Sequence, residues 1–84
     1  MMHEVSLIYE VLLHVEQASR QGGMNKVTII KLTIGEQMMV MPEALQFAFD
    51  TLRKGPAAEA ELKWEIIEGI YFYIDYIEGE ESSD

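Results

Sequence analysis

The segment that most restricts the fold is IYFYIDYI, residues 70–77, near the end of the chain. Its residues are apolar or aromatic on both faces of a strand, with Asp75 as the one charged exception. A strand without a polar face is typical of the middle of a sheet, where neighbouring strands and a covering layer keep it from water. The sequence therefore predicts a sheet with residues 70–77 as its central strand.

Two further segments have the two-residue period of a strand. Residues 26–35, KVTIIKLTIG, are rich in β-branched side chains, and residues 61–69, ELKWEIIEG, alternate apolar and charged positions. A helical crossover is expected between these two segments, and a hairpin at Glu68-Gly69 is expected to join the second to residues 70–77. With residues 70–77 in the middle, every neighbouring pair of strands is predicted to be antiparallel.

Two segments predict amphipathic helices. In residues 5–21 apolar positions recur at spacings of three and four, with Ser6 as a cap and Gly22-Gly23 as the stop. Residues 42–55, PEALQFAFDTLRKG, begin with proline and glutamate and end with basic residues and glycine, which suits the helix dipole. The predicted fold is α+β, in the order α-β-α-β-β, with two helices on one face of a three-stranded antiparallel sheet. One domain is expected over residues 1–84, with an acidic, disordered tail at 79–84.

Charge and composition exclude several functions. The 84 residues carry a net charge of −9, which disfavours nucleic acids and anionic membranes as partners and favours cations or basic proteins, although a plain acidic surface has the same composition. Cysteine is absent, which removes disulfides and thiolate metal sites. No secretory signal or membrane-spanning run is visible, so a cytoplasmic domain is expected.

The second face of the predicted sheet has no helix to cover it. Apolar and aromatic side chains on this face predict either docking of a partner or second copy, or a merely solvated surface. The side chains expected there are Val27, Ile29, Ile67, Tyr71, Tyr73 and Ile77, beside Lys31, Lys63, Glu65 and Asp75. Candidate partner-binding residues are Tyr71 and Tyr73, together with Met38 and Met39 of the MMVM run.

The first residues carry the most specific chemistry. Met1-Met2-His3 offers an amine, two backbone amides and an imidazole in sequence, a donor set that suits square-planar Ni(II) or Cu(II). If the chain starts at Met2, one amide fewer remains and Glu4 can add an oxygen. Any chain that begins X-X-His has the same capacity by chance, so this pattern alone leaves both interpretations open.

Two other groups compete as metal sites. Glu10 and His14 lie one turn apart, where they would share a helix face as ligands or as an ordinary surface pair. The thioethers of Met38, Met39 and Met41 suit Cu(I), but such residues also form adaptable apolar contacts. No hydroxyl has a positioned base and no glycine-rich phosphate loop is present, so an enzyme is not expected.

Three segments together resemble the HypA family of nickel metallochaperones. They are MHEVSL at residues 2–7, VTIIKLTIGE at residues 27–36 and MPEALQFAFDTLRKG at residues 41–55. The resemblance implies nickel delivery to [NiFe]-hydrogenase, or to urease, beside a maturation GTPase and the hydrogenase large subunit, with a homodimer as a further possibility. It also implies that Met2, His3 and Glu4 hold the nickel.

The sequence departs from the family pattern at two points. The family inserts a zinc domain with paired C-x-x-C motifs between its last two strands, and this chain has no cysteine, so we expect a member without that domain and without zinc. Met1 adds one residue before the Met-His-Glu pattern and changes the chelate rings. A metal-free interaction module that keeps the fold and acts through the open sheet face is therefore the alternative.

Overall fold

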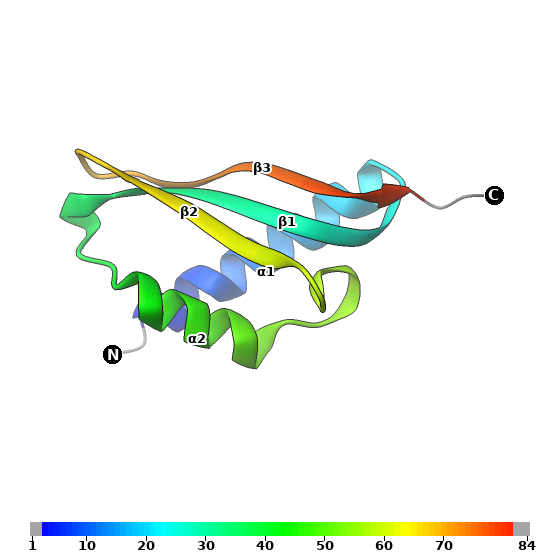
Figure 1. Cartoon of the computed structure of the whole chain (residues 1–84), viewed down its shortest axis with the longest axis horizontal. Helices are drawn as coiled ribbons and strands as arrows, with labels where there is room; N and C mark the ends of the chain where they lie inside the picture. Colours follow the sequence, from blue (N-terminus) through cyan, green and yellow to red (C-terminus); the bar gives the residue numbers. More distant parts are fainter. Residues whose placement is uncertain (1–2, 82–84) are drawn as a thin grey trace.

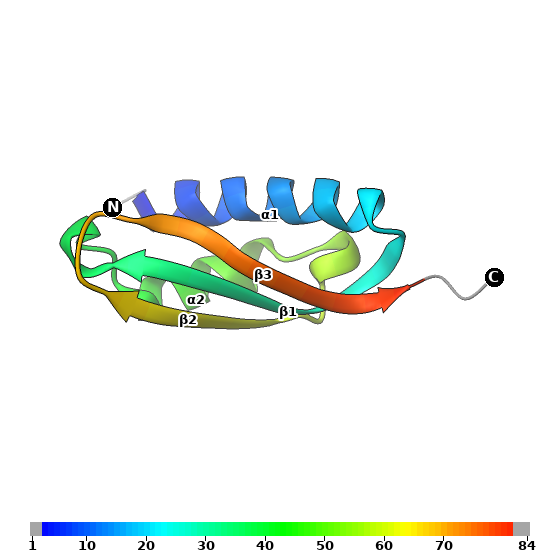
Figure 2. The ribbon, with the colours of Figure 1, turned by 90° about the horizontal axis from the view of Figure 1, so that it is seen from above.

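A computed structural model describes residues 3–81 and has the predicted α+β element order. Its helices and strands are α1 (His3–Gln21), β1 (Met24–Gly35), α2 (Pro42–Leu52), β2 (Glu61–Ile67) and β3 (Phe72–Glu81). Short 3-10 helices, η1 (Glu36–Met38) and η2 (Gly55–Ala57), precede and follow α2. Figures 1 and 2 show both helices on one side of a twisted sheet, as the apolar stripes predict.

The sheet is mixed, and its strand order is β2-β1-β3. The prediction of a purely antiparallel sheet centred on residues 70–77 is wrong: β1 is central, parallel to β2 and antiparallel to β3. A parallel neighbour follows from the crossover through α2, which returns the chain to the end of the sheet where β1 began. The two-sided apolar pattern of β3 instead reflects tyrosines, such as Tyr73 and Tyr76, that stay half exposed at an edge strand.

The connection between β2 and β3 crosses over the end of β1. The predicted hairpin at Glu68-Gly69 is wrong in this respect, because the strands it joins lie on opposite sides of β1 and do not pair. The Gly35 N–H donates to the carbonyl of Tyr71 at 2.6 Å, and the Gln37 N–H donates to the carbonyl of Gly69 at 3.0 Å. A Cβ at Gly35 would overlap backbone atoms of Gly69 and Tyr71, although its φ of −76° suits any residue. Glycine is required here for space.

The core lies between the helices and the inner face of the sheet. Its fully buried larger side chains come from α1, β1 and α2: Ile8, Val15, Val27, Ile30, Leu32, Ile34, Leu45 and Phe49. Val27 and Ile77 were expected on the open face, but Val27 is buried and Ile77 packs against the core. Bulges explain both corrections. One extra residue lies in β1 after Val27 and one in β3 near Asp75, and each exchanges which side chains of its strand face the helices and which face the open side.

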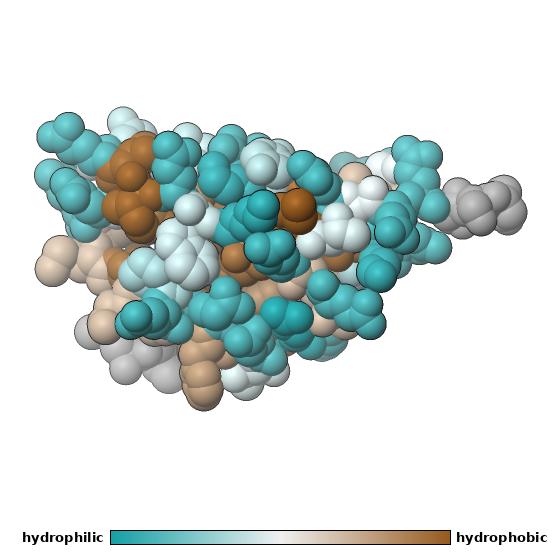
Figure 3. All heavy atoms as spheres, in the orientation of Figure 1, coloured by the Kyte–Doolittle hydropathy of each residue, from teal (hydrophilic) through white to brown (hydrophobic). Residues whose placement is uncertain are grey.

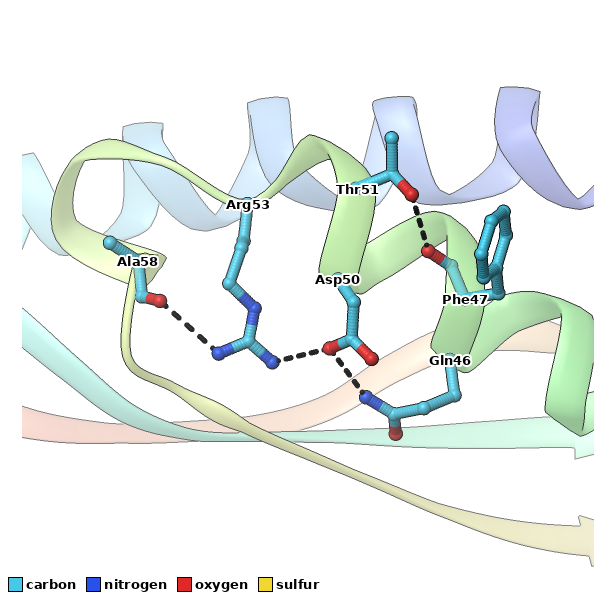
Figure 4. Close-up of polar contacts among 6 residues, drawn as sticks. All are labelled: Gln46, Phe47, Asp50, Thr51, Arg53 and Ala58. Carbon is cyan, nitrogen blue, oxygen red and sulfur yellow. Dashed lines mark hydrogen bonds and ion pairs between the residues drawn. The ribbon is translucent and has the colours of Figure 1, made fainter.

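The end of α2 is tied to the turn after η2 by Arg53, as Figure 4 shows. Its guanidinium donates to Asp50 Oδ1 at 2.8 Å and to the Ala58 carbonyl at 3.2 Å, and it stacks on the Phe49 ring at 4.4 Å. Gln46 also donates to Asp50 Oδ1, from one turn earlier in the helix. Because Arg53 itself is extended, α2 ends at Leu52, three residues before the predicted end.

Two ends also differ from the prediction. α1 begins at His3, and β3 continues to Glu81, so residues 79–81 belong to a strand and not to a disordered tail. Pairing of this part of β3 with the first residues of β1 explains the extension, since Lys26 lies opposite Glu80 and Met24 opposite Glu81. Residues 82–84 lie outside the described part. Neither α-helix within residues 3–81 combines the length and apolarity that a membrane span requires.

Candidate metal centre

The first turn of α1 holds the two predicted ligand side chains, His3 and Glu4, in different environments. His3 is exposed at the first residue of the helix. Glu4 is only 8 % exposed, because it occupies the first position of the helix stripe that continues with Ile8, Val11 and Val15 and faces the core. The imidazole is therefore accessible to a metal, while the carboxylate points inward.

The Glu4 carboxylate connects the start of α1 to the start of α2. Its Oε2 accepts a hydrogen bond from the Met41 N–H at 3.1 Å, directly before Pro42 begins α2. This bond, and next a bond from Glu4's own N–H, lower the pKa of Glu4, and the nearby His3 charge acts in the same direction. Glu4 is thus an ionised anchor with one oxygen already engaged.

A nickel site at this helix start needs donors beyond these two side chains. Within residues 3–81 no three histidine, aspartate or glutamate side chains form a group that could hold a metal. The first amide nitrogens of a helix lack an acceptor four residues earlier, which leaves the His3 nitrogen available to Ni(II) or Cu(II), whereas the Glu4 N–H already donates to its own carboxylate. The predicted contributions of Met1 and Met2 lie outside the described residues.

The loop before α2 contacts this helix start through the backbone of Met41. Met39 is 82 % exposed and adopts a left-handed φ of 59°, Met41 is exposed, and Met38 is partly buried. The Glu4–Met41 hydrogen bond brings this loop to α1 across 37 positions of sequence. Sequence reasoning missed the connection, and its one signal was an acidic residue placed on the apolar stripe of a helix.

Glu10 and His14 share a face of α1, as their spacing predicts. Both are exposed and line a shallow hollow of about 380 Å³ between α1 and β3, together with apolar residues such as Leu7 and Phe72. No third carboxylate or imidazole joins them in the part of the chain that the structure describes. The surface-pair interpretation accounts for this geometry without a metal.

The open face of the sheet is organised around Lys31. Its ammonium lies 3.1 Å from Asp75 on β3 and 3.3 Å from Glu65 on β2, and 5.9 Å from the centre of the Tyr76 ring. The hydrogen bond to Asp75, and then that to Glu65, raise the pKa of Lys31 above its ordinary value. Tyr73, a predicted partner-binding residue, is 49 % exposed opposite Thr33, on the same face.

One end of the molecule is more apolar than this charged centre. Figure 3 shows hydrophilic side chains over the middle of the surface and a hydrophobic patch near the end where β2 passes into β3. The exposed apolar residues of that segment are Ile66 and Ile70, and Tyr71 beside them is half exposed. The candidate partner-binding residue Tyr71 therefore lies in the link and Tyr73 on the strand.

Comparison with protein families and sequences gives a consistent result. The family described as "Hydrogenase/urease nickel incorporation, metallochaperone, hypA" matches residues 2–72. The hydrogenase maturation factor HypA of Moorella thermoacetica is 34 % identical over 113 residues, covering 94 % of this chain and 100 % of that protein. HypA of Methylocella silvestris is 41 % identical over 69 residues, covering 81 % of this chain but 61 % of that protein.

The fold also matches a solved structure. The solution structure of the nickel metallochaperone HypA from Helicobacter pylori superposes with a TM-score of 0.72 and 16 % sequence identity, over 87 % of this chain and 70 % of that one. Several other curated relatives are matched over only about half of their length. The connection of residues 68–71 between β2 and β3 contains no cysteine, which is consistent with a member that lacks the zinc-binding domain.

Proposed function

The chain belongs to the HypA family, and from this we propose that it binds Ni(II) at the start of α1 for the maturation of [NiFe]-hydrogenase or urease. Its matched relatives are maturation factors and metallochaperones, so we assign it an accessory role and not a catalytic one. The observation that carries the proposal is the exposed His3 imidazole, which lies inside the matched region, at the first residue of α1.

The chemistry of the helix start supports nickel as cargo. Nitrogen donors in a planar set favour Ni(II) and Cu(II) over Mg(II) or Ca(II), and His3 adds an imidazole to backbone nitrogens that the helix leaves unpaired. The positive end of the helix dipole opposes a bound cation, and the ionised Glu4 beside it offsets that opposition. His3 is then the principal ligand, while Glu4 contributes charge, or its second oxygen, from an anchored position.

The remaining parts of the proposal follow from the family. We assign the chain to the cytoplasm, with a maturation GTPase and the hydrogenase large subunit as partners. We expect no resident zinc, because thiolate ligands are absent. Nickel would therefore be bound and released without the second metal-binding domain.

Nickel titration tests this assignment. One equivalent of Ni(II), added to untagged protein whose first residue is established by mass spectrometry, should produce the weak visible absorption of a square-planar complex. His3→Ala should abolish this band, and acetylation of the terminal amine should weaken it. His14→Ala is the matched control, because it removes the other exposed histidine of α1 and should leave the band unchanged. Absence of nickel uptake at micromolar metal, or equal loss in both variants, would refute the proposal.

The exposed tyrosines of the sheet favour a second function, an adaptor that works without metal. Tyr71 and Tyr73 are half exposed, Tyr71 in the link next to Ile70 and Tyr73 on the open face opposite Thr33. A protein partner that remains bound in the presence of a chelator and is released by Tyr73→Glu would support this function. Loss of the same partner upon His3→Ala would instead assign the contact to the nickel site.

A further inference from the structure

The outer edge of β2 lacks a partner within residues 3–81. β2 is the terminal strand of the sheet and pairs only with β1, over its full length from Glu61 to Ile67. The backbone N–H and C=O groups that point away from β1 therefore have no strand to bond with, and such an edge is a template for pairing with another chain. Beside this edge, Ile66 is 45 % exposed and Trp64 is partly buried.

The sequence of β2 is complementary to itself over the whole strand in one antiparallel register. When two copies meet on a two-fold axis at Trp64, Lys63 of each copy lies opposite Glu65 of the other. Leu62 of each copy then lies opposite Ile66 of the other, on the helix side of the sheet. Opposite charges and apolar pairs directly across a strand pair are stabilising, so this register has no unfavourable pair at its centre.

The neighbouring registers and the other edge lack this property. An axis at Lys63 places Lys63 against Lys63 and Glu61 against Glu65, and an axis at Glu65 places that carboxylate against itself. At the opposite edge, β3 has Asp75, Glu78, Glu80 and Glu81 but no lysine or arginine, so two copies of β3 would repel each other. An axis at Leu62 also pairs Glu61 with Lys63, but it overlaps only residues 61–63 of the strand. Charge and length of contact together therefore select one edge and one register.

We propose that β2 is a self-association surface, through which two copies form a continuous six-stranded sheet with antiparallel β2 strands centred on Trp64. Lys63 makes no ion pair within residues 3–81, so it is available to a second copy. Glu65 is exposed, and Lys31 keeps its contact with Asp75 if Glu65 turns outward. A contact of seven residues per strand is smaller than a standard interface, so the dimer forms at concentrations well above micromolar.

Charge reversal tests the surface. Lys63→Glu and Glu65→Lys each place two like-charged pairs in the interface, and each should weaken dimerisation about tenfold or more in sedimentation equilibrium. The double variant Lys63→Glu/Glu65→Lys restores the opposite pairs and should return to within about threefold of the original dissociation constant. Glu36→Lys makes the same charge change as Glu65→Lys at an exposed residue of η1, so it is the control for that variant and should have no comparable effect.

Cysteine cross-linking tests the register. Because the chain has no native cysteine, a disulfide can form only between the introduced residues. Opposite residues of an antiparallel pair have Cα atoms about 4.5–5.5 Å apart, within reach of a disulfide. A mixture of Lys63→Cys and Glu65→Cys proteins should form a disulfide-linked dimer under mild oxidation, while either variant alone should not. Both positions are exposed, so neither substitution disturbs the core.

The outcomes separate cleanly. A cross-link in the mixture together with rescue by the double charge reversal supports the proposal. A cross-link in Lys63→Cys alone would show a different register, and assembly beyond a dimer would show head-to-tail pairing of edges. Each of these two results would overturn the proposal. A protein that stays monomeric at all concentrations, or a double charge reversal that does not restore dimerisation, would overturn it as well. None of these outcomes depends on whether nickel binds.

Discussion

Gly35→Ala should cost this small domain a large part of its stability, because the β2–β3 link lies directly over that residue. The added methyl group would overlap the backbone of Gly69 and Tyr71, which cannot rotate aside as a side chain can. The link must then move away from β1, which stretches the hydrogen bonds from Gly35 and Gln37. Two such bonds are worth about 2 kcal/mol and the forced shift about 1–3 kcal/mol. The total of about 3–5 kcal/mol is a large fraction of a free energy of unfolding of about 4–13 kcal/mol.

Urea unfolding, followed by the fluorescence of the single tryptophan, measures this loss. Gly23→Ala is the matched control, because Gly23 has a φ of +74° and open space around it, so alanine there meets only left-handed strain of about 1–2 kcal/mol. A thermal midpoint lowered by at least about 10 °C is expected for Gly35→Ala. If Gly35→Ala lost no more stability than Gly23→Ala, the link would not lie over β1 as described.

Three further predictions concern charge and packing. Glu4→Gln should lower the free energy of unfolding, with the whole loss present above pH 4.5. The loss should shrink as the pH falls through the lowered pKa of Glu4, because the original protein then loses its carboxylate too. A loss that stayed constant in urea unfolding between pH 3 and 7 would contradict the Met41 contact. Lys31→Met should lower the free energy of unfolding, with the whole loss present below pH 10.5. The loss should shrink as the pH rises through the raised pKa of Lys31, because the ammonium then loses its charge. Urea unfolding at alkaline pH measures this change and so tests the contacts of Lys31 with Asp75 and Glu65. Phe49→Ala removes a fully buried ring and should lower the free energy of unfolding by about 3–5 kcal/mol. Phe47→Ala removes a ring that is 74 % exposed and should change this free energy by less than about 0.5 kcal/mol. Equal losses in the two variants would refute the assigned faces of α2.

The helices were predictable because their signals are local. Pro42 at the first position of α2, the glycine pair after α1 and the apolar stripes each act within a few residues. The end of α2 was missed because Arg53 is held by Asp50 and by the carbonyl of Ala58, five residues later. The element order therefore followed from the sequence, while that boundary depended on a contact after the helix.

The strand order was not predictable from the period of each strand alone. Lys31 gave β1 the pattern of a strand with a solvated face, yet acidic side chains from both neighbouring strands neutralise it. A lone lysine between two apolar stretches, with acidic residues at the middle of two other strands, is the signal that would have placed β1 in the centre. The bulges that moved Val27 and Ile77 inward left no such signal, since an extra residue is defined only by the partner strand.

For the candidate metal site, the sequence located the helix start but assigned Glu4 only as a ligand. Its second role, as the acceptor for the Met41 N–H, joins residues far apart in the chain and depends on how α1 and α2 pack. His3 was expected at a chain end and is found exposed at the first residue of α1. The assignment of nickel to this position stays a prediction that the titration addresses.

The route of the chain from β2 to β3 has a consequence for evolution and for protein engineering. Since every rung of the hydrogen-bond ladder involves β1, neither flanking strand depends on the length of the segment that joins them. The entropy of closing a loop grows only slowly with its length, so a whole module can be gained or deleted beside Glu68 with the strand pairing retained. A module that displaces Gly69 or Tyr71 would also remove the hydrogen bonds that these residues accept from Gln37 and Gly35. The same position is a natural place to graft a new metal-binding or recognition element onto this small protein.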